Sequence, residues 1–341
     1  MRTTIVVVPR ERFTSLPESL SSLFRTVPDD VPVVVVEGAS PARTRSALVA
    51  LARERPFTLL SLPYMLKPNE ARNRGVAVAS TEFVVIADND IEYERGWLAA
   101  LEQHALEHGS DAVAPLTCIG PPVATTIHHA GGLLEASRVN GHVELSERHR
   151  LMDVPLAGAA LPEVENQVCE FHCMLARRSL LDELGGLDER LVTREQIDFA
   201  LRSLTAGAKV TFAREAVVTY MAGNRFDAVD LQYHLFRWSD RFVVESLDAL
   251  ESTWNVNLDR DLYRFSWAAK HRLRAAETTY PRRRRLLGKE RFRRWVVSRL
   301  EERVVSEQTR AREGLVPAVP PAPSGDRVDE VVSGLPEPVK G

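Results

Sequence analysis

The chain has 341 residues, of which 44% are hydrophobic and 27% are charged, as in ordinary globular proteins. Its net charge of −3 argues against a protein built to coat nucleic acid, and no hydrophobic stretch approaches the roughly 20 residues that span a bilayer. Three cysteines are too few for a disulfide scaffold, and the chain starts in a strand-like run rather than a leader, so we expect a cytoplasmic protein.

Hydrophobic runs and helical segments alternate through the first 117 residues. The runs are continuously apolar and rich in β-branched residues, as in strands buried on both faces. They are residues 4–8, 31–36, 57–62, 83–87 and 111–116. This alternation predicts an α/β fold, a Rossmann-like doubly wound and mostly parallel sheet. In such sheets, ligands bind at the carboxyl ends of the strands.

The next hundred residues are less regular. Residues 118–165 carry scattered glycines and prolines and predict loops and short strands over the site, and a strand is expected to return at 169–176. A helix is predicted to begin near Thr193, with Gln196 completing a capping box and Gly207 following its end. Residues 210–212 and 216–220 look like closing strands.

An acidic motif, Asp88-Asn89-Asp90, ends the fourth predicted strand. On an extended segment the side chains of Asp88 and Asp90 point the same way and Asn89 points the other way. Two converging carboxylates suit Mg²⁺ or Mn²⁺, which fills its other positions with water and phosphate oxygens. The alternative is a plain turn, because Asp and Asn bond their own backbone at strand ends.

The chain resembles the family 2 glycosyltransferases of the GT-A fold over roughly residues 3–220. The resemblance is carried, in order, by "IVVVPRER", "VVVVEGAS", "NEARNRGVAVASTEFVVIADND", "FHCMLARRSLLDELGGLDERLVTREQIDFALRSLTAGAKV" and "AVVTY". A related group with Glu-x-x-Asp-Phe and Arg-Trp-Ser-Asp segments matches residues 195–199 and 237–240. The resemblance implies transfer of a sugar, with inversion, from a nucleotide diphosphate sugar and with help from Mn²⁺ or Mg²⁺.

Several site residues are implied by the resemblance. Asp90 is expected to be the main metal ligand, with Asp88 as the second. The expected nucleotide contacts are Pro9, Glu37, Arg72, Asn73, Asp88 and Asn89. For Glu37 and Arg72 the alternatives are an ordinary strand-end acid and a solvated helix charge.

The base that takes the acceptor's proton departs from the family pattern. Gln196 stands where the family normally has an Asp, and glutamine cannot accept a proton. Glu195 and Asp198 lie three apart and so share a helical face. We predict Glu195 as the base, with Asp198 supporting it or taking its role. The alternatives are that these acids only favour the helix dipole, or that the protein is a catalytically degenerate nucleotide-sugar-binding module.

A histidine ligand for the metal is also missing from its usual place, because Tyr220 and Met221 occupy that strand end. This leaves a sparse metal site completed by the donor. The segment Cys169, His172 and Cys173 does not have zinc-site spacing, and we interpret His172 as a structural histidine. The adjacent His128 and His129 are interpreted in the same way.

The organisation follows from these assignments. We expect a GT-A domain at 1–225, with a nucleotide-binding half at 1–117 and an acceptor half at 118–225, then a helical extension at 226–313 and a disordered tail at 314–341. Residues 281–300 form a basic amphipathic segment that could lie on the inner face of an anionic membrane, or pack on its own domain.

The acceptor is left open by the sequence. A saccharide, a lipid carrier, a peptide and a natural product are all compatible with it, whereas nucleic acid is not expected. A sugar nucleotidyltransferase is the competing enzyme class, but it calls for a glycine-rich loop after the first strand, where this chain has "PRERFTSLPES".

Overall fold

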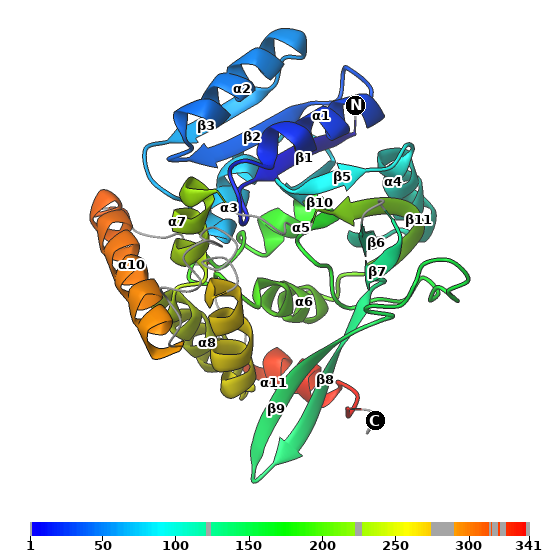
Figure 1. Cartoon of the computed structure of the whole chain (residues 1–341). Coiled ribbons are helices and arrows are strands. Elements are labelled where there is room, and N and C mark those ends of the chain that lie inside the picture. Colours follow the sequence, from blue (N-terminus) through cyan, green and yellow to red (C-terminus); the bar gives the residue numbers. More distant parts are fainter. Residues whose placement is uncertain are drawn as a thin grey trace.

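The structure, a computed structural model, describes residues 2–120, 124–221, 227–273, 290–313, 315, 320 and 325–338. One large sheet is the centre of the fold, with helices on both of its faces (Figure 1). Its strands are β1 (Thr3–Val8), β2 (Val33–Gly38), β3 (Thr58–Leu62), β4 (Phe83–Asp88), β5 (Ile91–Tyr93), β6 (Ala112–Ile119), β7 (Thr126–His129), β10 (Cys173–Arg177) and β11 (Val210–Tyr220). The expected α/β class is confirmed.

Strand order in this sheet is β3-β2-β1-β4-β10-β6-β11-β5, and β7 pairs with β6. The pairs β3-β2, β2-β1, β1-β4 and β6-β11 are parallel, whereas β10 runs antiparallel to both β4 and β6. The helices that alternate with the first strands are α1 (Leu16–Thr26), α2 (Ala42–Glu54), α3 (Pro68–Val78) and α4 (Trp97–His108). The sheet is therefore doubly wound and mostly parallel, as predicted.

The central strands are buried on both faces because their side chains feed two separate cores. Val6 and Ile86 belong to one core, and Ile5 and Val85 to the other, so neighbouring residues of β1 and β4 point to opposite sides. The prediction of burial is wrong for β3, whose residues are exposed or half-buried. This strand lies at the edge of the sheet and, among the described strands, pairs with β2 alone.

The region expected to be irregular contains a long hairpin. Strands β8 (Gly132–Val139) and β9 (His142–His149) pair antiparallel along their whole length and form a two-stranded sheet that projects from the main one (Figure 1). The returning strand is shorter than expected, since β10 starts at Cys173. The two expected closing strands form one strand, β11, with an irregularity between Ala213 and Val217.

The helix α6 (Glu195–Thr205) follows the short helix α5 (Arg178–Glu183) and begins without the predicted capping box. Its N-cap residue is Arg194, in a left-handed conformation with φ of 58°, and no side chain caps it. Gln196 instead donates from Nε2 to Glu147 Oε2 at 2.9 Å. Gly207 does follow the helix end, with φ of 72°, as predicted.

The helices after residue 226 pack directly on the sheet domain. They are α7 (Ala228–Arg237), α8 (Asp240–Trp254), the π-helix η1 (Leu262–Ala268), α10 (Glu290–Ala311) and α11 (Gly325–Ser333). Asp230 of α7 accepts hydrogen bonds from the backbone N–H groups of Phe13 and Thr14, at 2.8 and 3.2 Å. Tyr233 donates to the carbonyl oxygens of Pro9 and Leu66. The helical extension therefore fixes the loop that follows β1.

The last part of the chain differs from expectation. Helix α11 lies within the segment expected to be disordered, and Val332 and Leu335 are buried in a core shared with α6 and α8. Two apolar side chains that leave water in this way give the segment a reason to order. Residues 281–289 of the expected basic segment lie outside the described residues. In its described part, Val297 of α10 packs against Leu231 and Leu235 of α7. Within the part of the chain that is described, no helix is long and apolar enough to cross a bilayer.

Candidate active site

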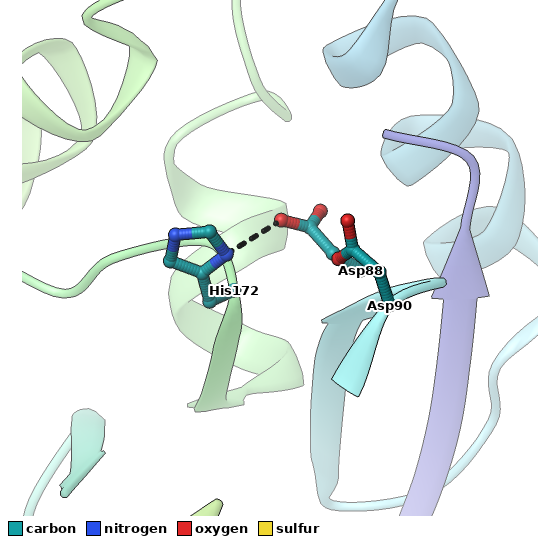
Figure 2. A group of neighbouring side chains, drawn as sticks. All are labelled: Asp88, Asp90 and His172. Atoms are coloured by element: carbon teal, nitrogen blue, oxygen red, sulfur yellow. Dashed lines mark ion pairs between the residues drawn. The ribbon is translucent and has the colours of Figure 1, made fainter. Parts of the chain in front are cut away.

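Asp88, Asp90 and His172 converge at the carboxyl end of β4, and we call them the Asp-Asp-His site (Figure 2). One potential ligand atom from each lies within 4.8 Å of the other two. Asp88 closes β4, Asp90 lies in the turn to β5, and His172 directly precedes β10, which pairs with β4. All three side chains are buried.

Asp88 and Asp90 differ in their neighbours. Asp88 accepts hydrogen bonds from Arg10 Nη1 at 2.9 Å and Arg72 Nη2 at 3.3 Å, and His172 Nδ1 lies 3.4 Å from its Oδ2. Burial alone would raise the pKa of Asp88, but these neighbours outweigh it and lower the pKa to about 2. Burial, and then the charge of Asp88, raise the pKa of Asp90 to about 7.

Asp90 is the residue whose unpaired carboxylate most favours a bound cation. Neither of its carboxylate oxygens has a hydrogen-bond partner among the described residues, although Asp90 is fully buried. His172 Nδ1 lies 3.4 Å from Asp88 Oδ2 but makes no well-oriented hydrogen bond among the described residues. An unpaired buried carboxylate is costly, and carboxylate oxygens with an imidazole nitrogen are suitable ligands for a divalent metal. The residues present therefore fit the expected metal.

His172 departs from our interpretation of it as a structural histidine. The strand end at Tyr220 indeed offers no imidazole, but the Tyr220 ring packs on the His172 ring with centroids 4.4 Å apart. The imidazole thus reaches the carboxylates from the residue that precedes β10. Only the pairing of β10 with β4, which the sequence does not display, brings it there.

Glu195 lies at the start of α6 and lines the cavity beside this site. Its Oε1 accepts from Arg72 Nη1 at 3.2 Å and from Arg237 Nη2 at 3.3 Å. Burial alone would raise the pKa of Glu195, but Arg237, Arg72 and Arg10 together lower it. Arg72 thus contacts both Glu195 and Asp88, and it is itself completely buried.

Arg72 reaches this position because α3 lies close on β1. A Cβ atom at Gly75 would come within 2.1 Å of Val6 Cγ1, so any larger residue would push the helix outward. The guanidinium group also lies over the Phe171 ring, 4.0 Å from its centroid. The alternative of a solvated helix charge does not describe Arg72.

Asp198 is held apart from the cavity. Its oxygens accept from Arg202 Nε at 2.8 Å and Trp254 Nε1 at 2.9 Å, and it is not among the cavity-lining residues. Burial raises the pKa of Asp198 in spite of these donors. The spacing of three residues placed Glu195 and Asp198 on one helical face, but the surroundings of the two carboxylates differ.

The remaining predicted nucleotide contacts hold loops at the same edge of the sheet. Asn89 points away from the two aspartates, accepting from Arg10 N at 3.0 Å and donating to the Arg12 carbonyl at 2.6 Å. Glu37 accepts from Ser40 N at 3.1 Å and from the Ser61 hydroxyl.

Pro9 and Asn73 are likewise engaged with the protein. Pro9 accepts from Tyr233 through its carbonyl. Asn73 donates to the Leu187 carbonyl at 2.8 Å and to Glu189 Oε1 at 3.0 Å. None of Pro9, Glu37, Asn73 and Asn89 lines the cavity described next.

A cavity of about 150 Å³ opens beside the Asp-Asp-His site. Its lining includes residues that the sequence analysis missed, namely Arg10, Glu11, His149, Glu170, Arg194, Trp267 and His271. Glu11 accepts from Trp238 Nε1 at 3.2 Å and from the Tyr220 hydroxyl at 3.3 Å. The sequence contains one pattern that points to some of these residues, since Glu147 and His149, like Glu170 and His172, form a Glu-x-His pair.

Similar solved structures include GalNAc-T7 with UDP, GalNAc and Mn²⁺, with a TM-score of 0.51 and 14% identity over 80% of this chain and 54% of that one. A mannosyltransferase from Pyrobaculum calidifontis with GDP-Man and Mn²⁺ gives a TM-score of 0.49 and 17% identity, covering 92% of this chain and 88% of that one. The first of these supports the fold.

Sequence comparisons give the family. The pre-mycofactocin glycosyltransferase of Mycobacterium tuberculosis is 26% identical over 162 residues, which are 48% of this chain and 32% of that protein. The match thus spans about a third of that relative's length. The sequence profile described as "Glycosyl transferase family 2" matches residues 4–185, more than half of the chain. The protein therefore belongs to glycosyl transferase family 2.

Proposed function

We propose that the protein transfers a sugar from a nucleotide diphosphate sugar to an acceptor nucleophile, with inversion and with help from Mn²⁺ or Mg²⁺. The observation that carries this proposal is Asp90, a buried carboxylate without a partner among the described residues, beside Asp88 and His172. GalNAc-T7, which has the same fold, holds UDP and Mn²⁺. The family assignment supports the reaction class.

Asp90 and His172 would hold the cation, with Asp88 alongside them. A bound divalent ion stabilises the negative charge that develops on a leaving nucleoside diphosphate. Arg10 and Arg72 contact Asp88 and bring positive charge to the same end of the sheet. We assign the nucleotide to this end, where Pro9, Glu37, Asn73 and Asn89 shape the loops after the strands.

We propose Glu195 as the group that takes the acceptor's proton. It lines the cavity, whereas Asp198 is bonded to Arg202 and Trp254. The lowered pKa of Glu195 makes it a weak base while Arg72 and Arg237 are its partners. A diphosphate close to these guanidinium groups would compete for them and so raise the basicity of Glu195. Asp198 then supports the base only by anchoring α6.

The domain division follows the same logic. The sheet from β1 to β4 would bind the donor and the segment 118–225 the acceptor. The helices after 226 supply Arg237, Trp238, Trp267 and His271 to the cavity wall, so they belong to the site as well. The acceptor stays open among saccharides, lipid carriers, peptides and natural products, and contact of residues 281–300 with a membrane stays part of this proposal.

Calorimetry tests the donor site. Purified protein is titrated with UDP and GDP, each with Mn²⁺ and with EDTA. We expect binding of at least one nucleotide that depends on Mn²⁺, and loss of that dependence in Asp90→Ala. Asp248→Ala, which changes an exposed acid on α8, is the matched control and should bind as wild type does. Equal affinity for wild type and Asp90→Ala would refute the metal assignment.

A further inference from the structure

A second group of metal-binding side chains lies beside the first site. Glu147 and His149 come from β9 and Glu170 from the segment before β10, and we call them the Glu-His-Glu cluster. His149 Nε2 lies 2.7 Å from Glu147 Oε1 and 3.4 Å from Glu170 Oε1. One ligand atom from each residue lies within 4.8 Å of the other two. Both carboxylates therefore converge on one imidazole nitrogen.

The neighbours of Glu147 orient this carboxylate. Its Oε2 accepts from Gln196 Nε2 at 2.9 Å and lies 3.4 Å from Arg194 Nη1. This arrangement leaves Oε1 directed at His149. Carboxylates that ligate metals are commonly held in this way by hydrogen bonds to the other oxygen. Gln196, whose amide cannot serve as a base, thus has a clear role in fixing Glu147.

A further histidine next to the cluster has one ring nitrogen without a hydrogen bond among the described residues. His129 is 1% exposed, and among the described residues its Nε2 has no hydrogen bond. Its ring meets the His149 ring edge-on, with centroids 5.1 Å apart. The unpaired Nε2 therefore lies in a buried imidazole that is in direct contact with the cluster. It is an observation independent of the two carboxylates.

We propose that the Glu-His-Glu cluster binds a divalent cation of its own, separate from the cation at the Asp-Asp-His site. One imidazole and two carboxylates suit Zn²⁺ or Mn²⁺. His149 and Glu170 line the cavity, so the cation's remaining positions face the space where an acceptor would lie. A cation in this place would make a bound hydroxyl more acidic. The inference goes beyond the proposed transfer, and its test needs no turnover.

Metal-binding stoichiometry tests the inference on the full chain. Metal-stripped, nucleotide-free protein is titrated with ZnCl₂ and, separately, with MnCl₂ by calorimetry. We expect wild type to bind one more equivalent of at least one cation than His149→Gln does. Asp90→Asn should keep the equivalent that depends on His149. Glu147→Gln, which preserves the size of the side chain, should weaken the same equivalent at least 100-fold.

The controls separate loss of a ligand from loss of the fold. His142→Gln changes an exposed histidine on the same strand and should bind as wild type does. Circular dichroism and melting curves identify any variant that does not fold, and a crystal soaked in Zn²⁺ should show an anomalous peak at the cluster. Equal stoichiometry in wild type, His149→Gln and Glu147→Gln overturns the inference and leaves a hydrogen-bonded cluster. Binding of UDP or GDP with Mn²⁺ is unaffected by that result, so the proposed function is tested separately.

Discussion

At the scale of single residues, the main feature of the site is that Asp88 and Asp90 have different surroundings. Asp88 receives two arginines, whereas Asp90 has none as a hydrogen-bond partner among the described residues. The difference arises because the side chain of Arg72 on α3 and that of Arg10 after β1 both reach Asp88. Fixed arginines thus favour the charged form of Asp88, whereas the protonation of Asp90 depends on its burial and on the charge of Asp88.

This dependence predicts how stability changes with pH. The pKa of Asp90 is raised to about 7 in the folded, metal-free protein, above its value in the unfolded chain. As pH rises, Asp90 loses its proton at a lower pH in the unfolded chain than in the folded protein. Ionisation of Asp90 therefore lowers the free energy of unfolding progressively between about pH 4 and about pH 7. Asp90→Asn should therefore raise the free energy of unfolding by up to a few kcal/mol at pH 8, and by less at pH 5.

Urea denaturation in EDTA at both pH values measures this effect. Without EDTA, added Mn²⁺ should stabilise wild type but not Asp90→Asn. The difference in the free energy of unfolding between the two proteins at pH 8 should therefore become smaller. A variant that is no more stable than wild type at pH 8 would show that Asp90 finds a partner elsewhere.

Glu195 gives a second prediction at this scale. Glu195→Gln removes the charge but keeps an oxygen that accepts from Arg72 and Arg237. Turnover of the nucleotide sugar should fall at least 100-fold, because a general base typically contributes that much. The Mn²⁺-dependent affinity for UDP or GDP should be kept or increased, because the diphosphate no longer competes with a carboxylate for the two arginines. Asp198→Asn should lower the free energy of unfolding, and it should reduce turnover much less than Glu195→Gln does. An unchanged turnover rate in Glu195→Gln would place the base elsewhere.

At the scale of elements, α6 connects the site to the C-terminal helices. Its first residue lines the cavity, Asp198 accepts from Trp254 at the end of α8, and Ile197 belongs to the core that also includes Leu335. The helix begins without a capping side chain, and its first carboxylate pairs with arginines of α3 and α7. Tertiary contacts, rather than local capping, therefore fix where α6 starts.

The link between α6 and α8 predicts a stability effect. Trp254 is 1% exposed and donates from Nε1 to Asp198 Oδ1. Trp254→Phe keeps an aromatic ring but leaves a buried carboxylate oxygen without its donor, which costs about 1–3 kcal/mol. Chemical denaturation should show this loss. Trp295→Phe, at an exposed position on α10, is the control and should change stability by less than about 0.5 kcal/mol.

Helix α11 gives a related prediction. The backbone N–H of Ala136 on β8 donates to the Pro336 carbonyl at 2.9 Å, so the end of the chain also covers the edge of the hairpin. Deleting residues 325–341 should lower the free energy of unfolding by about 1–3 kcal/mol, because Val332 and Leu335 leave the core. Glu337→Gln, at an exposed position after α11, is the control and should have no measurable effect. Equal melting temperatures for the deletion and wild type would mean that α11 does not dock in solution.

At the scale of the whole molecule, the later helices complete a site that begins on the sheet. Loops after β1 and β4 bring the acids, and α7 brings Arg237 and anchors the loop after β1 through Asp230. The cavity is bounded by side chains from widely separated parts of the chain, from Arg10 to His271. Ligand binding should therefore stabilise the fold as one unit.

Thermal unfolding tests this coupling. A nucleoside diphosphate with Mn²⁺ at 100 times its dissociation constant should add about 2.7 kcal/mol, which raises the melting temperature by several degrees. The nucleotide with EDTA should have a much smaller effect. Two separate transitions, of which only one responds to the ligand, would contradict a single cooperative unit.

The sequence by itself determined the sheet and the acidic motif. Continuous β-branched runs favour strands, so the predicted strands of the first half lie close to their observed bounds, although β3 is exposed at the edge of the sheet. The alternation of side chains along a strand was enough to place Asp88 and Asp90 together and Asn89 apart.

Only the tertiary structure decided which side chains join them. His172, Arg10, Arg72 and Arg237 meet the acids through strand pairing and helix docking between residues far apart in the chain. Asp198 shows the reverse, since helical spacing placed it with Glu195 but Arg202 and Trp254 hold it elsewhere. Local patterns report which face of an element is buried, whereas the identity of the partner depends on how the elements pack.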